Sequence, residues 1–306
     1  MDIKLYDLLI IGAGPAGLSA GIYGARAGLK TIIIEKGIAG GTIAMVHFIE
    51  NYPGFPDGIS GNKLGDLMKR QCLNFGVELV YREVKTIMRE EKFFRITTDS
   101  GDYLSKSVII ASGSSPRRLN VPGENELLGR GISYCATCDG PLFKNQNIAV
   151  VGCGNSGLQE GKFLFNFAKT ITFIEFLPRI TADKILYDYF ADKKKVEFVL
   201  NSEVVSIEGV SKVEAIKVKD RKNGVIRTIN VSGVFIYIGL IPNIQFVKGL
   251  VNIDNDGFII TNERFETSMP GVFAAGDIRA KEIRQIVVAC SEGAQAAINA
   301  YHFLNG

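Results

Sequence analysis

The hydrophobic pattern of the chain begins with a short apolar run, Leu8-Leu9-Ile10-Ile11, which predicts a strand buried on both faces. A glycine-rich turn at residues 12–17 follows, and helical spacing then continues to Ala27 with Gly28 as its stop. A second apolar run, residues 31–34, is closed by an acidic residue. This region therefore predicts a strand–turn–helix–strand unit.

A unit of the same kind recurs in the middle of the chain. Apolar residues 148–151 precede a second glycine turn at 152–157, helical sequence continues to Lys169, and residues 172–174 end in Glu175. The first glycine and the closing acid are 23 residues apart in both copies, from 12 to 35 and from 152 to 175. A duplicated unit is much harder to obtain by chance than a single motif.

The spacing of the glycines indicates what each unit binds. In a G-x-G-x-x-G turn the first glycine permits the tight turn, the second lets the backbone approach a pyrophosphate, and the third lets helix pack on strand. The pyrophosphate rests on the helix N-terminus, and the closing acid accepts a hydrogen bond from a ribose hydroxyl. Two copies predict two dinucleotides, one a permanent cofactor and the other a visiting substrate. A glycine-rich turn without a ligand is the alternative.

The remaining pattern predicts mainly short strands. Segments 114–118 and 239–243 combine turn residues and are expected to be linkers. Cys72 and Cys290 share helical spacing with apolar or small residues and are expected to pack in the core. The other predicted elements are helices over 59–75 and 290–303, and strands over 78–81, 93–98, 102–104, 108–111, 196–205, 213–219, 228–237 and 271–274.

A Cys-x-x-Cys motif lies between the two units, at Cys135-Ala136-Thr137-Cys138, with Asp139 directly behind it. One helical turn places both sulfurs on the same face, and a helix that starts near Cys135 offers free N–H groups to its thiolate. Such a motif forms either half of a zinc site or a dithiol/disulfide couple. Zinc needs two more ligands, but the other cysteines are isolated and the only histidines are His47 and His302. The redox couple is therefore favoured, and no metal site is expected.

Composition narrows the class of protein. A chain of 306 residues predicts about two domains. The net charge of +3 is too small to indicate binding to nucleic acid or to an anionic membrane, and no apolar run reaches membrane-spanning length. Five cysteines, an odd number, without a secretory context indicate a reducing cytoplasm.

Taken together, these motifs resemble those of the low-molecular-weight thioredoxin reductases, which belong to the two-dinucleotide flavoprotein disulfide reductases. The resemblance extends over nearly the whole chain. It is carried by both glycine turns, the loop at residues 50–54, the Cys135–Asp139 stretch, Gly276-Asp277 and Arg284-Gln285. Of these, the Cys-Ala-Thr-Cys-Asp stretch is the most specific.

The resemblance implies an α/β fold with two Rossmann-like, three-layer dinucleotide-binding domains, the second inserted into the first. An FAD-binding domain would comprise residues 1–114 and 244–306, and a nicotinamide-binding-like domain carrying the disulfide would comprise 115–243. It also implies a homodimer and a rotation between the domains. FAD would contact Gly12, Gly14, Ala16, Gly17, Glu35, Lys36, Gly40, Gly41, Thr42, Asn51, Gly113, Asp277, Arg284, Gln285 and Ile286. The nicotinamide nucleotide would contact Gly152, Gly154, Asn155, Ser156, Gly157 and Glu175.

The same resemblance implies the chemistry: FAD passes electrons to the Cys135–Cys138 disulfide, and the pair reduces thioredoxin or a thioredoxin-like protein. Cys138 would face the flavin, Cys135 would attack the partner's disulfide, and Asp139 would act as the acid. Members of the family that use NADPH carry a basic run after the second strand, whereas this chain has Glu175-Phe176-Leu177. NADH is therefore expected in preference to NADPH as co-substrate. Ferredoxin or another carrier as donor, and a non-enzymatic flavin-bound redox sensor, are the alternatives.

Overall fold

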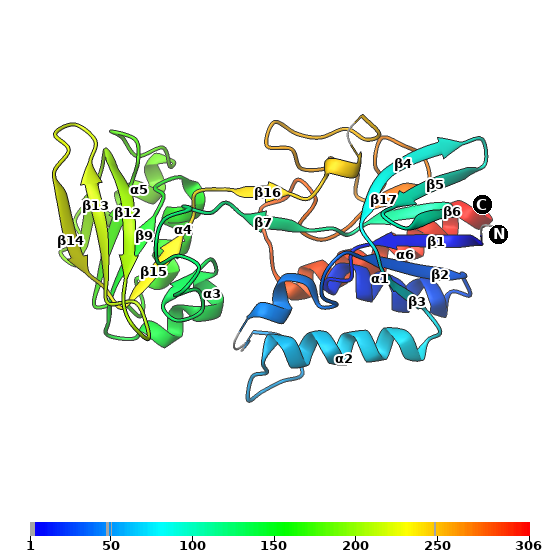
Figure 1. Cartoon of the computed structure of the whole chain (residues 1–306), viewed down its shortest axis with the longest axis horizontal. Coiled ribbons are helices and arrows are strands. Elements are labelled where there is room, and N and C mark those ends of the chain that lie inside the picture. Colours follow the sequence, from blue (N-terminus) through cyan, green and yellow to red (C-terminus); the bar gives the residue numbers. More distant parts are fainter. Residues whose placement is uncertain (1–3, 47–48, 50, 248) are drawn as a thin grey trace. The chain divides into compact units, whose positions relative to one another are not determined.

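The computed structural model describes residues 4–46, 49, 51–247 and 249–306 (Figure 1). His47 and Glu50, named above, lie outside the described residues. The chain divides into two compact units. The first unit comprises Met1–Ser115 together with Ile241–Gly306, and the second comprises Pro116–Leu240. The second unit is thus inserted in the sequence of the first.

The first unit is built on a parallel sheet. Both faces of the central strand are covered, since Leu8 and Ile10 pack in one apolar cluster and Leu9 and Ile11 in the other. This burial explains the uninterrupted apolar run at this position. In spatial order the parallel strands are β3 (Glu78–Tyr81), β2 (Thr31–Glu35), β1 (Leu5–Ile11), β6 (Gly101–Ile110) and β17 (Val272–Ala274).

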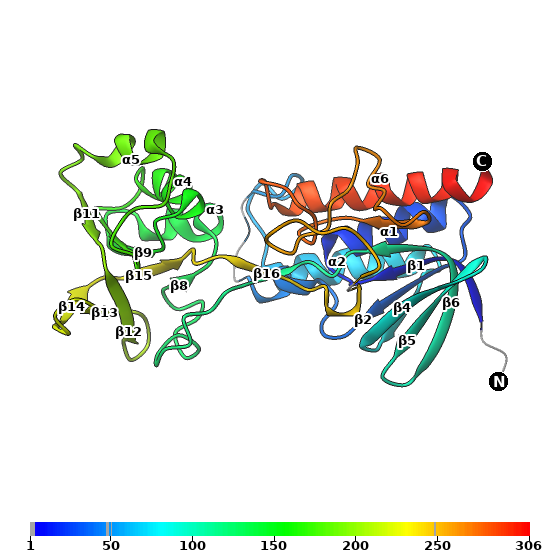
Figure 2. The same cartoon turned by 90° about the horizontal axis from the view of Figure 1, so that it is seen from above.

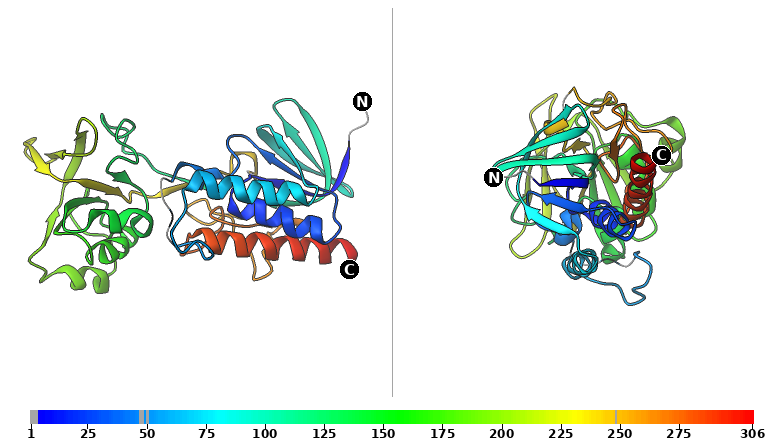
Figure 3. Two further views of the ribbon diagram at one scale, coloured as in Figure 1. Left: turned by 90° about the horizontal axis from the view of Figure 1, so that it is seen from below. Right: turned by 90° about the vertical axis from the view of Figure 1, so that its right-hand side faces the viewer.

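Three helices cover one face of this sheet, and α1 (Pro15–Arg26) lies between α2 (Gly61–Asn74) and α6 (Ile286–Asn305) (Figure 3). The close approach of α1 and α6 requires a glycine, because a Cβ atom on Gly293 would lie 2.0 Å from the carbonyl oxygen of Ala16. A short 3-10 helix, η1 (Gly41–Met45), precedes α2. In α2 the side chain of Cys72 is buried, which confirms its predicted core position.

An antiparallel extension is formed by β4 (Val84–Glu90), β5 (Phe93–Thr98) and the first half of β6 (Figure 2). The sequence predicted two separate strands over 102–104 and 108–111, and this was wrong because β6 is continuous. The polar residues that seemed to interrupt it, Ser105 and Ser107, are buried and donate their hydroxyls to the backbone carbonyls of Ser107 and Asp7. Satisfied hydroxyls do not break a strand.

The second unit repeats this plan. Its parallel sheet is covered by α4 (Asn155–Leu164) and α5 (Lys184–Phe190), and α3 (Ala136–Asp139) packs against α4. The sequence predicted that the helix after the second glycine turn continues to Lys169, but α4 ends earlier, at Leu164. The parallel strands are, in spatial order, β11 (Val196–Val199), β10 (Thr170–Ile174), β9 (Asn147–Val151), β15 (Gly233–Ile236) and β8 (Ile132–Ser133).

Beside it lies an antiparallel sheet of β12 (Ser202–Glu208), β13 (Ala215–Asp220) and β14 (Ile226–Asn230). The strands predicted over 196–205 and 228–237 were wrong in extent, because each spans two strands that belong to different sheets. The first break falls at Asn201, whose φ of 49° ends the extended conformation. In the first unit β6 joins the parallel strands and the antiparallel extension in one sheet, whereas here β14 and β15 belong to two separate sheets.

The chain passes twice between the units, and both segments lie within the predicted linkers. They form the short strands β7 (Ser114–Pro116) and β16 (Leu240–Pro242), which pair with each other. Two further 3-10 helices are η2 (Gly140–Phe143) and η3 (Gln245–Val247). Among the described residues, no helix combines the length and apolar character needed to cross a bilayer.

Candidate functional site

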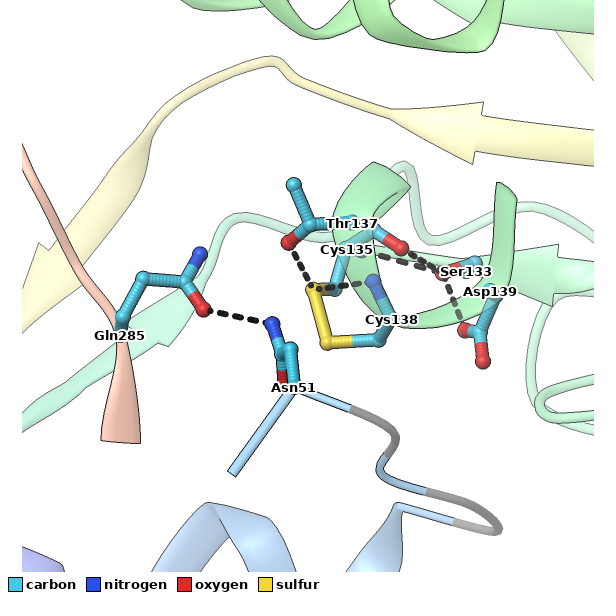
Figure 4. The surroundings of a disulfide bond; sticks show 7 residues. All are labelled: Asn51, Ser133, Cys135, Thr137, Cys138, Asp139 and Gln285. Atoms are coloured by element: carbon cyan, nitrogen blue, oxygen red, sulfur yellow. Dashed lines mark hydrogen bonds between the residues drawn. A yellow bond between two sulfur atoms is a disulfide. The ribbon is translucent and has the colours of Figure 1, made fainter. Parts of the chain in front are cut away.

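The cysteine pair of the second unit forms a disulfide at the start of α3, with the two Cα atoms 5.3 Å apart (Figure 4). Cys135 is the N-cap residue, and its sulfur accepts the backbone N–H of Cys138 at 3.2 Å. The hydroxyl of Thr137 lies 3.4 Å from the same sulfur. Because both contacts reach Cys135, the local field favours a thiolate on this residue once the bond is reduced. The sulfurs are bonded to each other, so this state holds a redox couple rather than a pair of thiolate ligands.

The acid behind the disulfide is tied to it through a serine. The hydroxyl of Ser133 lies 2.5 Å from Oδ2 of Asp139, to which it donates, and it accepts the backbone N–H of Cys135 at 3.0 Å (Figure 4). Ser133 thus fixes the carboxylate relative to the backbone of the attacking cysteine. Sequence reasoning gave Ser133 no role, because a lone serine two residues before a Cys-x-x-Cys motif has no distinctive spacing.

The remaining cysteines are unsuited to exchange chemistry. Burial raises the pKa of Cys72 to about 12, and burial also raises the pKa of Cys153 and of Cys290. Cys153 is completely buried in the second glycine turn, which confirms the prediction that it is a small packing residue. Among the described cysteines, only Cys135 and Cys138 form a disulfide.

The first glycine turn has the geometry of a dinucleotide cradle. Gly12 has a φ of +105°, and a Cβ atom on Gly17 would lie 1.8 Å from the carbonyl oxygen of Gly12, so both positions require glycine. No atom lies within 4 Å of a Cβ built on Gly14, which leaves room for a ligand there. Glu35 accepts the backbone N–H groups of Ala13 (2.7 Å) and Gly37 (2.6 Å), which fixes its carboxylate beside the turn.

The second turn reproduces these contacts. Gly152 has a φ of +106°, and a Cβ atom on Gly157 would lie 2.0 Å from the carbonyl oxygen of Gly152. Glu175 accepts the backbone N–H groups of Cys153 (2.6 Å) and Leu177 (2.9 Å). Each carboxylate has lone pairs left after two such bonds, so both can accept a ribose hydroxyl as well.

The C-terminal part of the predicted FAD set meets the first turn within the first unit. A Cβ atom on Gly276 would lie 2.9 Å from Cβ of Ala16, so the turn that carries Asp277 lies against the start of α1. Nε of Arg284 is buried without a hydrogen-bond partner among the described residues, whereas the buried Oδ1 of Asp277 forms an ion pair with Lys281. Buried polar atoms normally have hydrogen-bond partners, so the unpaired Nε of Arg284 fits a polar ligand such as FAD.

The other predicted FAD contacts are distributed around this cradle. The side-chain amide of Asn51 donates to that of Gln285 at 3.2 Å, which links the loop before α2 to the residue preceding α6. Ile286 begins α6. Gly40, Gly41 and Gly113 have φ values of +104°, +59° and +65°. Lys36 and Thr42 are exposed.

Sequence reasoning missed the residue that anchors this region, Glu292. Its carboxylate accepts the backbone N–H of Gly276 at 2.7 Å and forms ion pairs with Arg279 at 2.9 Å and Lys281 at 3.2 Å. All three side chains are largely buried, and Lys281 also lies 3.2 Å from Oδ1 of Asp277. One glutamate in a helix of small residues gave no signal, because its partners come from a preceding loop.

A second missed residue lies beside Glu175. The guanidinium of Arg221 is centred 3.6 Å from the centroid of the Phe176 ring and donates to the Phe176 carbonyl at 3.0 Å. Nearby, the side chains of Asn155 and Asp183 bond to each other at 3.1 Å, and Ser156 is exposed at the start of α4. Arg221 follows β13 and is distant in sequence from Glu175, so no local sequence pattern could predict a positive charge beside Phe176.

Comparison with known proteins gives one consistent result. Residues 6–293 match the protein family described as pyridine nucleotide-disulphide oxidoreductase. The chain is 42% identical over 302 residues to a thioredoxin reductase of Listeria innocua, covering 98% of this chain and 94% of that protein. It is 41% identical to the thioredoxin reductase of Bacillus subtilis, covering 98% and 95%. The crystal structure of a thioredoxin reductase from Streptococcus pyogenes superposes with a TM-score of 0.92 at 42% identity, covering 99% of both chains.

Proposed function

Because the chain belongs to the low-molecular-weight thioredoxin reductases of the pyridine nucleotide-disulphide oxidoreductase family, we propose that it reduces the disulfide of a thioredoxin, with FAD as its cofactor. The observation that carries the proposal is the Cys135–Cys138 disulfide at the start of α3, with Asp139 fixed behind it. Protein disulfide exchange needs a thiolate beside a proton donor, and this arrangement supplies both. We also expect a homodimer in the cytoplasm.

The first unit offers the residues for FAD. The first glycine turn would hold the pyrophosphate at the N-terminus of α1, and Glu35 would accept a ribose hydroxyl. Arg284 would direct its unpaired buried Nε, and Asp277 its carboxylate, to the polar part of the ligand. When bound, FAD supplies two-electron transfer between a donor and the disulfide.

The reduced pair then acts on the partner protein. The thiolate of Cys135 attacks one sulfur of the thioredoxin disulfide, forms a mixed disulfide and releases one thioredoxin thiolate. The thiolate of Cys138 next attacks the Cys135 sulfur, which restores the disulfide and releases the second thioredoxin thiol. Ser133 would hold the Asp139 carboxyl group beside this exchange, where it can take up and release the proton. One dithiol is oxidised and one disulfide is reduced, so the electrons balance.

The second unit supports NADH as the preferred donor. Glu175 has the same two backbone contacts as Glu35, and its negative charge would repel a 2′-phosphate while accepting a free 2′-hydroxyl. The apolar Phe176 and Leu177 replace a basic run at this point.

We expect NADH to reduce the flavin at lower concentrations than NADPH. The measurement is anaerobic bleaching of the flavin absorbance by NADH, NADPH or reduced ferredoxin, each titrated separately. Flavin reduction by micromolar NADPH would contradict the role assigned to Glu175. If only ferredoxin reduced the flavin, ferredoxin would be the electron donor. The proposed disulfide chemistry would then be unchanged, but no nicotinamide nucleotide would take part.

The role of Arg221 in binding the nicotinamide nucleotide can be tested by removing its side chain. We expect Arg221→Ala to weaken binding of the nicotinamide nucleotide about tenfold, because the exposed ring of Phe176 loses the planar group stacked on it. Binding is measured by titration calorimetry on the oxidised protein. The control variant is Arg227→Ala, which removes an exposed arginine from β14, the strand that follows Arg221, and should leave the affinity unchanged. Equal affinities for wild type and Arg221→Ala would exclude the stacked arginine from the site.

A further inference from the structure

One buried carboxylate of the second unit has no part in the chemistry described so far. The residue is Glu124, which is only 1% exposed. Its Oε1 accepts the backbone N–H of Leu119 at 3.1 Å, and its Oε2 accepts that of Asn120 at 2.7 Å. Oε1 also accepts the hydroxyl of Tyr134 at 2.5 Å. A buried acid with three donors is therefore bonded to the residue that directly precedes Cys135.

The loop that carries Glu124 is anchored to the antiparallel sheet of the second unit. The carbonyl oxygen of Pro122 accepts the backbone N–H of Ile207 in β12 at 2.9 Å. A Cβ atom on Gly123 would lie 1.8 Å from the carbonyl oxygen of Ile207, so this close approach requires glycine. Val121 packs on the apolar cluster to which Ile207 belongs. The carboxylate of Glu124 thus has a fixed base, from which it can hold another segment in place.

The segment that leads into the disulfide needs such support. The strand β8 has two residues and pairs with β15 at the edge of the parallel sheet, so its ladder alone fixes little of the chain. After β8, Tyr134 packs on the apolar cluster at one face of this sheet, whereas Ala136 packs in the cluster at the other face. Cys135 lies between them, so the position of its backbone depends on the side chains of its neighbours.

Two side chains hold this backbone. The hydroxyl of Ser133 accepts the N–H of Cys135, as described above, and the hydroxyl of Tyr134 donates to Glu124. Burial, and then the hydrogen bond with Glu124, raises the pKa of Tyr134 above its ordinary value. The phenol therefore keeps its proton and remains a donor. Hydrogen bonds to a charged acceptor are among the stronger ones in proteins, so this contact can fix the residue next to the cysteine.

We propose that Glu124 is a positioning residue for the disulfide and that, through Tyr134, it holds Cys135 where its sulfur meets that of Cys138. This inference rests on the proposed disulfide chemistry. A fixed backbone presents each thiol to the other at a high effective concentration, which favours the disulfide over the dithiol. The same effective concentration speeds the attack of Cys138 on a mixed disulfide at Cys135. Loss of the Tyr134–Glu124 bond should lower both.

The test equilibrates the FAD-loaded protein with glutathione and glutathione disulfide. Two glutathione thiols reduce the Cys135–Cys138 disulfide and yield one glutathione disulfide, so the electrons balance. Alkylation of the thiols and mass spectrometry then give the ratio of disulfide to dithiol. We expect Tyr134→Phe to lower this ratio about tenfold, which corresponds to roughly 30 mV for a two-electron couple. During turnover with thioredoxin, the mixed disulfide at Cys135 should accumulate in this variant.

Three further variants show whether the bond itself is responsible. Glu124→Ala removes the acceptor and should lower the ratio at least as far as Tyr134→Phe. The double variant should lower it no further than Glu124→Ala, because the tyrosine hydroxyl has already lost its acceptor there. Tyr6→Phe is the matched control, since Tyr6 donates to Glu78 at 2.7 Å in the first unit. It loses the same kind of bond and should keep the wild-type ratio.

A Tyr134→Phe protein with the wild-type ratio of disulfide to dithiol would overturn the proposal. A bond that only stabilised the fold would support the oxidised and reduced proteins equally and would give this result. A double variant whose effects multiply would also overturn it, because the two side chains would then act independently. If Glu124→Ala does not fold, Tyr134→Phe decides alone, since it loses only a hydroxyl. The glutathione equilibrium needs no thioredoxin, so a wild-type protein that never reduces thioredoxin would contradict the proposed function and leave this measurement intact.

Discussion

Replacing Cys138 by serine is expected to abolish reduction of thioredoxin, with a loss in kcat of at least about 1,000-fold. The serine hydroxyl cannot form the Cys135–Cys138 disulfide, so the pair can neither accept two electrons nor resolve a mixed disulfide. The protein should still bind FAD, because its proposed FAD residues all lie in the other unit. Turnover is measured with thioredoxin and a disulfide dye, and FAD content by absorbance.

A control variant at another cysteine separates the loss of the disulfide from a general loss of folding or activity. Cys290→Ser changes a partly buried thiol in α6 that forms no disulfide, and it should keep the wild-type rate. Cys135→Ser should be as inactive as Cys138→Ser. The two variants should differ in one respect: only Cys138→Ser, which keeps Cys135, should form a stable mixed disulfide with thioredoxin. Undiminished turnover in Cys138→Ser would require another route for the electrons and would refute the proposed chemistry.

Replacing Gly17 by alanine is expected to cause both loss of FAD and loss of stability, of about 3 kcal/mol. The new Cβ atom would lie 1.8 Å from the carbonyl oxygen of Gly12, so the turn between β1 and α1 must open. Since that turn is the proposed pyrophosphate site, the two losses should occur together. Thermal unfolding and the FAD-to-protein absorbance ratio measure them.

The control lies three residues earlier in the same turn. Gly14→Ala adds a Cβ atom into open space at an ordinary φ of −74°, so the apoprotein should unfold at the wild-type temperature while FAD binds more weakly. Gly154→Ala makes the corresponding change in the second unit and should weaken only the nicotinamide nucleotide. If Gly14→Ala kept full FAD affinity, the first turn would not be the pyrophosphate site.

Much of this architecture could be predicted because its signals are local. Buried parallel strands produce continuous apolar runs, and a close backbone approach requires glycine at fixed spacing, so residues 8–17 and 148–157 predict their own conformation. The suggested thiolate stabilisation required a helix that starts near Cys135, and Cys135 is the N-cap residue of α3.

The parts that could not be predicted depend on partners distant in sequence. The residues that form β6 and those that form β14 and β15 have similar apolar content, yet one is a single strand and the other is divided between two sheets. The ion pairs of Glu292 and the stacking of Arg221 join segments that no periodicity connects. Pattern reasoning describes one segment at a time, whereas these features arise only when the sheets are assembled.

The packing of α1 against α6 has a consequence for biosynthesis. Gly293 and Gly276 approach Ala16 so closely that the proposed flavin cradle joins segments translated before and after the inserted unit. The ribosome must release residues 116–240 before that cradle can close, so the inserted unit has the opportunity to fold first. The flavin can therefore be bound only after α6 has been translated, and nascent chains halted before α6 should emerge colourless.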